Sequence, residues 1–160
     1  MIISRELTPG EWTSLSPGLA GALRDRGARP RLREAAHLGA RIAGVLRGTP
    51  PPVLTRGDMI WWPATPPDLS VSGCEADMAV LQHELQHVLD YRIGWLSAVR
   101  YLSHPRHWTY DFTLAATTRW NDLGAEQRAS MAEALWWLER GHGSPDDLAA
   151  LRRIVPWATP

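Results

Sequence analysis

The stretch Val80-Leu81-Gln82-His83-Glu84-Leu85-Gln86-His87-Val88-Leu89 decides the class of this protein, because it contains His-Glu-x-x-His among uncharged neighbours. Residues four apart lie one above the other on the same face of a helix. His83 and His87 can therefore direct two imidazoles at one point, as a tetrahedral Zn²⁺ requires. Glu84 is rotated by one residue, in the general-base position of a zinc hydrolase. The spacing predicts a zinc site with Glu84 as its catalytic base.

The flanks of this motif favour a metal site over its main alternative. That alternative is a surface helix carrying two solvated histidines and a solvated glutamate. The residues around the motif are uncharged, however, so the helix is expected to be buried. Burying ionisable groups costs on the order of several kcal/mol unless a metal or a partner compensates. A bound metal ion is therefore the better explanation.

Capping signals place the ends of this metal helix. Ser72-x-x-Glu75 is a capping box, and Gly94 suits the position just past a helix end, so the helix should span about residues 73–92. Cys74 then lies roughly 13 Å from His83 along the axis, too far to be a ligand. We expect Cys74 to be a small buried residue.

The chain as a whole is expected to form one domain over residues 1–160, long enough for a single core. Acidic and basic residues balance at 17 each, which argues against a nucleic-acid or anionic-membrane partner. One cysteine excludes an internal disulfide framework. The N-terminus has no secretory signal pattern and no run is long enough to span a membrane, so a cytoplasmic protein is expected, although export by a dedicated machine would leave no mark.

The remaining pattern predicts an α+β, mostly helical fold with a small sheet or edge strand beside the metal helix. Caps and apolar spacing predict further helices, at 9–15, 17–26, 38–46, 124–140 and 145–154. Short strands are expected at 31–36 and 59–62. Because Pro63 ends the second strand and two more prolines follow, that strand suits an open sheet edge where a peptide could add. An ordinary core strand is the alternative. Residues 95–120 show no clear helix.

The third zinc ligand is left open by the spacing. The pattern His-Glu-x-x-His-x-x-Gly-x-x-His would need glycine and histidine where this chain has Asp90 and Ile93, so that arrangement is excluded. A glutamate on a later helix, Glu126, or a histidine of the following loop, His107 or His104, can supply the ligand. An acidic residue in a first helical turn is also explained by the helix dipole alone.

Two further acidic residues are candidates for positions near the metal site. Glu133 lies two turns after Glu126 on the same expected helix. Asp90 lies seven residues after His83 on nearly the same face, and it could orient a ligand imidazole by accepting its second N–H. A plain surface charge is the alternative for Asp90.

The order of these features resembles the zincin-like bacterial "vgr-related" proteins, related to the peptidase-like core domain of contractile injection systems. The specific part of the likeness is the metal helix, similar to their His-Glu-Leu-Thr-His-Val. Looser likenesses run from residue 5 to about 140; they are Leu7-Thr8-Pro9-Gly10-Glu11, the segment from Gly57 through Pro63, Tyr110, and Glu126-Gln127-Arg128-Ala129. Gln86 stands where these proteins have Thr, and Arg128 stands where they have a second Gln.

The resemblance implies a gluzincin-type site in a zincin-like domain, with Glu126 as the third metal ligand beside His83 and His87. By the same analogy Tyr110 is expected to stabilise the oxyanion, with His107 behind it. A link to a secretion or injection apparatus is implied by the resemblance only.

The expected function is therefore that of a zinc-dependent metallopeptidase acting on a peptide or protein substrate. Zn²⁺ would acidify its water and polarise the scissile carbonyl, while Glu84 takes the proton of the water and passes it to the leaving amine. The alternative is a non-catalytic zincin-fold adaptor or effector-associated binding protein. Hydrolysis of another amide, such as a cell-wall cross-link, is not separable from peptide hydrolysis by sequence, because substrate choice lies in the loops.

Overall fold

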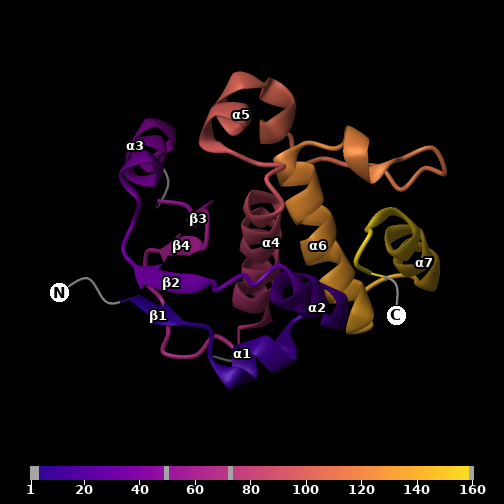
Figure 1. Ribbon diagram of the computed structural model, residues 1–160, viewed down its shortest axis with the longest axis horizontal. Coiled ribbons are helices and arrows are strands. Elements are labelled where there is room, and N and C mark those ends of the chain that lie inside the picture. The colour runs from indigo at the N-terminus through magenta and orange to yellow at the C-terminus, as the bar shows by residue number, and fades with distance from the viewer. Residues whose placement is uncertain (1–3, 49–50, 72–73, 159–160) are drawn as a thin grey trace.

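The computed structural model describes residues 4–48, 51–71 and 74–158. This part of the chain has an α+β, mostly helical fold with a small four-stranded mixed sheet, as the sequence pattern predicts. The helix α4, Glu75–Arg92, runs through the middle of the molecule. It contacts the sheet on one side and the helix α6, Ala125–Glu139, on the other (Figure 1). The two helices that carry the predicted ligands are thus direct neighbours.

The sheet has the strand order β1-β2-β4-β3, formed by Ser4–Glu6, Arg31–Glu34, Met59–Trp62 and Leu54–Arg56 respectively. The strands β2 and β4 pair in parallel, and the two outer strands pair antiparallel to their neighbours. The edge-strand prediction for 59–62 is therefore wrong. Pro63 follows the last residue of β4 and removes no hydrogen bond from the sheet. The edge strand beside α4 is β3, whose three residues are too few to produce a recognisable sequence pattern.

The N-terminal helices are α1, Pro9–Ser14, α2, Pro17–Asp25, and α3, Leu38–Arg47. The predicted cap of α1 is present, since the Glu11 N–H donates to Thr8 Oγ1 at 3.0 Å and the Thr8 N–H donates to Glu11 Oε2 at 2.8 Å. Glu11 is also fully buried and accepts two hydrogen bonds of 2.7 Å from Arg5. One carboxylate thereby joins β1 to the start of α1.

The C-terminal part contains α5, Ala98–Ser103, the short 3₁₀ segments η1, Pro105–Trp108, and η2, Trp120–Asp122, and the helix α7, Pro145–Ile154. The helix α5 was not predicted, because its six residues carry no apolar period that reaches the core. The α6 prediction is confirmed: Met131 and Leu135 are fully buried, and Gly141 follows in a left-handed conformation. No helix within the described ranges is long and apolar enough to cross a bilayer.

The main hydrophobic core is built around α4. Its residues Leu81, Leu85 and Val88 are completely buried among leucines of α2 and the sheet residues Leu32 and Ile60. A second cluster joins α6 to α7, and Trp157 packs against both clusters. Residues 81–90 of α4, which include the His-Glu-x-x-His motif, are all buried.

The start of α4 corrects one prediction. Cys74 is exposed rather than buried, because it precedes the first helical residue and makes no side-chain cap. The predicted capping residue Ser72 lies outside the described residues. At the other end Gly94 has φ +72°, the conformation that a glycine past a helix end adopts most easily, as predicted.

Candidate metal centre

Three predicted residues meet at one point between α4 and α6. His83 Nε2 lies 3.0 Å from Glu126 Oε2, and His87 Nε2 lies 3.5 Å from the same oxygen. One possible ligand atom from each of the three residues lies within 4.8 Å of the others. The structure thus brings together the two histidines of the motif and the glutamate of the later helix. Among the described residues, neither His104 nor His107 belongs to this cluster.

The meeting of these residues follows from how α4 is packed. Leu81, Leu85 and Val88 turn one face of α4 toward the sheet, so the face with His83 and His87 turns toward α6. The two rings lie 5.1 Å apart between centroids. Their side chains are only 11% and 9% exposed. Solvated surface histidines, the alternative to a metal site, are therefore excluded.

Glu126 is placed by the packing of η1 against the start of α6. His107 is fully buried, and its Nδ1 accepts a hydrogen bond of 3.1 Å from the Ala125 N–H. Gly124 precedes this turn, and a Cβ there would lie only 2.0 Å from the main-chain oxygen of Arg106. Only glycine permits this approach. His107 thus caps the helix that carries Glu126, a role that the sequence pattern did not suggest.

Two more side chains contact the cluster residues, one at His83 and one at Glu126. Glu133 Oε2 lies 3.3 Å from His83 Nδ1, the ring nitrogen that faces away from Glu126. Tyr101 on α5 donates a hydrogen bond of 2.7 Å from its hydroxyl to Glu126 Oε1. The helix α5 was not predicted, so Tyr101 was missed as well.

Glu84 lies beside the cluster but is held by a different element. Its Oε2 accepts a hydrogen bond of 2.7 Å from the Oγ1 of Thr55, and both residues are buried. Thr55 is the middle residue of the edge strand β3. The sheet therefore fixes the orientation of this carboxylate, while α6 supplies the partner of the histidines.

The charges in the cluster stabilise one another. Burial by itself would lower the pKa of His83, but its hydrogen bonds with Glu126 and Glu133 raise that pKa to about 10. Burial opposes ionisation of Glu126, yet contacts with His83, His87 and the Tyr101 hydroxyl hold its pKa well below the usual range. Without a metal, the cluster is thus an ion pair between a protonated His83 and an ionised Glu126.

The donor set fits a metal ion. Bonds of roughly 2.0–2.2 Å to a tetrahedral ion separate the ligand atoms by roughly 3.4 Å. The distances of 3.0 and 3.5 Å from Glu126 Oε2 to the two imidazole nitrogens agree with that separation. A cation can also replace the proton on His83 as the positive partner of Glu126. Two of the three separations between possible ligand atoms thus already suit a bound metal ion.

Behind His87 lies a second buried charged pair. Asp90 is completely buried, and its Oδ1 lies 3.3 Å from Arg128 Nη1 on α6. Burial raises the pKa of Asp90 to about 6, although interactions with Arg128, His87 and Gln86 act to lower it. The guanidinium of Arg128 lies 3.4 Å from the centre of the Trp95 ring. Asp90 is therefore not the surface charge that was its alternative interpretation.

Two other residues that the sequence analysis singled out, Tyr110 and His104, have exposed side chains. Tyr110 is 56% exposed, and its ring stacks on that of His83 at 6.0 Å between centroids. His104 is exposed at the start of η1. Tyr110 is thus exposed beside the cluster, whereas Tyr101 is half-buried.

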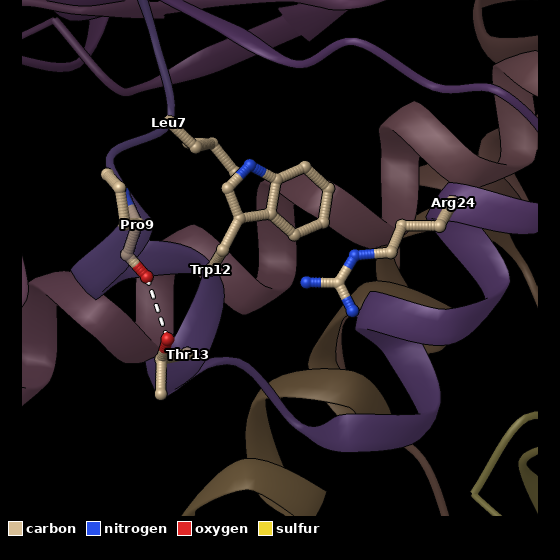
Figure 2. A pocket seen from close by; sticks show the side chains of 5 residues that line it. All are labelled: Leu7, Pro9, Trp12, Thr13 and Arg24. Carbon is tan, nitrogen blue, oxygen red and sulfur yellow. Dashed lines mark hydrogen bonds between the residues drawn. The ribbon is translucent and has the colours of Figure 1, made fainter.

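A separate hollow lies away from this centre, between β1 and the first two helices. Leu7, Pro9, Trp12, Thr13 and Arg24 line it (Figure 2). The guanidinium of Arg24 points toward the Trp12 ring at 5.0 Å. None of the metal-centre residues lines this hollow.

Comparison of the chain with protein-family models, with curated proteins and with solved structures finds no match.

Proposed function

We propose that the protein is a zinc-dependent metallopeptidase of the zincin type, with His83, His87 and Glu126 as the metal ligands. The observation that carries this proposal is the contact of Glu126 Oε2 with the ring nitrogens of both motif histidines. Two imidazoles and one carboxylate form the ligand set of the His₂Glu class of zinc peptidases. The resemblance to zincin-like bacterial proteins supports the same assignment.

Zinc is the proposed ion because two neutral imidazoles and a carboxylate suit a borderline-soft cation better than Mg²⁺ or Ca²⁺, which prefer oxygen ligands. Zinc in such a site supplies Lewis acidity toward a carbonyl oxygen and makes a water molecule more acidic. The three protein ligands leave a coordination position for a reactant.

Glu84 is the proposed general base and acid. Thr55 already holds its Oε2, so we assign proton transfer to Oε1. This oxygen takes a proton from the attacking water and later delivers it to the nitrogen of the leaving amine, so the carboxylate is regenerated. Because Thr55 restricts the carboxylate, the base is oriented before a substrate binds.

Tyr110 is the proposed donor to the oxyanion that forms from the scissile carbonyl. Its stacking on His83 and its exposed side support this role, because a substrate reaches the centre from solvent. Tyr110→Phe keeps the ring and removes the hydroxyl. The variant is expected to lower kcat about 100-fold while it leaves zinc affinity unchanged.

Metal analysis of the purified protein tests the ligand set. Wild type should contain one equivalent of zinc, and His83→Ala and Glu126→Ala should each lose it. His142→Ala and Glu75→Ala are matched controls, because both side chains are more than half exposed and lie outside the cluster. A full equivalent of zinc in Glu126→Ala would show that Glu126 is not a metal ligand.

Cleavage of a randomised peptide library, followed by mass spectrometry, tests catalysis separately. Wild-type protein with zinc should cleave peptides, and Glu84→Gln should bind zinc normally while losing at least about 1,000-fold in rate. A wild type that binds zinc and cleaves no peptide would instead indicate a non-catalytic binding protein. Zinc binding without catalysis and loss of the zinc site are thus distinguishable outcomes.

A further inference from the structure

The two motif histidines differ in what lies behind their rings. His83 turns Nε2 to Glu126, and its Nδ1 faces Glu133 at 3.3 Å. His87 also turns Nε2 to Glu126, but its Nδ1 is buried and has no hydrogen-bond partner among the described residues. A histidine that binds a metal through one nitrogen carries its proton on the other, and that N–H usually meets a carboxylate or carbonyl. His87 therefore lacks the outer partner that His83 has.

Asp90 carries the complementary unpaired atom. It follows His87 by three residues, a spacing that brings side chains together on a helix surface. Its side chain is completely buried, with Oδ1 facing Arg128. Its Oδ2 has no hydrogen-bond partner in the described part of the chain. Two buried polar atoms one turn apart on α4 thus lack hydrogen-bond partners, as do Nε and Nη2 of the neighbouring Arg128.

Arg128 fixes this aspartate from the neighbouring helix. It follows Glu126 by two residues on α6 and is only 1% exposed. Its guanidinium is packed on Trp95 and lies 5.0 Å from the Trp120 ring. A buried guanidinium held in this way fixes the position of the carboxylate that it contacts. The same helix therefore carries a metal ligand and the anchor of Asp90.

We propose that Asp90 is the positioning residue of His87: its Oδ2 accepts the Nδ1–H of the ring and so presents Nε2 to the metal. Both unsatisfied buried atoms acquire partners through this one hydrogen bond, which removes the desolvation cost of leaving each of them unpaired. Arg128 acts through Asp90. The helix α6 therefore determines both the position of Glu126 and the orientation of the His87 ring. This inference rests on the proposed metal site and goes beyond its ligand set.

The competing explanation is that Asp90 and Arg128 form only a structural ion pair. Replacing both members by apolar residues of similar volume separates the two explanations, because such replacements of buried pairs often leave stability unchanged or improved. The double variant Asp90→Leu with Arg128→Met removes the carboxylate without leaving a buried charge. The conservative variant Asp90→Asn keeps the volume and removes the charge.

Zinc affinity, measured by competition with a chelator, is the first readout. Loss of an outer-shell partner typically weakens metal binding 10–100-fold. We expect a loss of that size in the double variant and a smaller loss in Asp90→Asn. Asp58→Asn, which removes a more exposed acid paired with Arg92, is the control and should retain wild-type affinity. A folded double variant with wild-type zinc affinity would overturn the proposal.

Nuclear magnetic resonance of the zinc-loaded protein gives a second readout that a merely structural pair would not move. Wild type should show a slowly exchanging Nδ1–H signal from His87, and the double variant should lose it. A His87 ring bonded to zinc through Nδ1 would also refute the assignment. If wild type binds no zinc, the proposed function fails too. If wild type binds zinc and the variants bind it equally well, only the role of Asp90 fails.

Discussion

Thr55 on the edge strand β3 donates a hydrogen bond of 2.7 Å to Glu84 on α4, and both side chains are buried. This contact joins the sheet to the proposed catalytic base. A hydrogen bond to a charged acceptor is worth about 1.5–3 kcal/mol, more than a neutral one. The sheet therefore orients the proposed catalytic base without supplying one of the three proposed metal ligands.

Thr55→Val tests this contact, because valine keeps the shape of threonine and removes the hydroxyl. We expect the free energy of unfolding to fall by about 1–3 kcal/mol and the peptidase rate to fall about tenfold, since Glu84 loses its only described donor. Urea unfolding and peptide cleavage measure the two effects. Thr55→Ser restores the hydroxyl and should recover most of both. Zinc content should not change, because the hydrogen-bond partner of Thr55 is Glu84 and not one of the three proposed ligands.

Tyr101→Phe tests the outer support of Glu126. The Tyr101 hydroxyl donates to Oε1 of Glu126, the oxygen that does not face the histidines. Removing it frees the carboxylate to rotate, so zinc affinity should weaken about tenfold. Chelator competition measures this change. Equal affinity in Tyr101→Phe and wild type would show that α6 alone holds Glu126.

The pH dependence of the metal-free protein follows from the His83–Glu126 pair. Folding raises the pKa of His83 from 6.5 to about 10, so its contribution is complete below pH 6.5 and is lost as the pH rises toward 10. Folding lowers the pKa of Glu126 from 4.5, so its contribution is present above that pH and is lost as the pH falls. Both contributions are therefore complete only between pH 4.5 and 6.5.

Urea unfolding of wild type and Glu126→Gln in a chelating buffer measures this window. The difference between their unfolding free energies should be largest inside the window and should shrink on both sides. A difference that does not vary with pH would contradict the ion pair. Zinc must also displace the His83 proton, so binding near pH 8 should release about one proton, which calorimetry in buffers of different ionisation enthalpy detects.

Gly124→Ala tests the placement of α6. The added Cβ would meet the main-chain oxygen of Arg106 at 2.0 Å, and main chain cannot move aside cheaply. We expect destabilisation by about 1–3 kcal/mol together with weaker zinc binding, because η1 and Glu126 separate. Gly21→Ala is the control: on α2 its Cβ meets nothing within 4 Å, so it should stabilise the protein by up to about 1 kcal/mol. Thermal unfolding compares the two.

Local patterns determined much of this protein from the sequence alone. The spacing of His83 and His87 requires one helix face, the Thr8 cap starts α1, and the glycines at 94 and 141 end their helices. Each of these depends on interactions among residues a few positions apart, which is why the sequence displays them. The mostly helical α+β class follows from the same kind of pattern.

The tertiary structure alone decided which groups meet. The strand β3 has only three residues, too few for the sequence to predict it. It nevertheless brings the Thr55 hydroxyl to Glu84 and makes β4 an inner strand of the sheet. Glu126 was one of three open alternatives, and the packing of η1 on α6 brings it to the histidines. Asp90 and Arg128 lie 38 residues apart and pair only because α4 and α6 pack together. Contacts between distant segments depend on the packing of whole elements, and no local spacing in the chain encodes them.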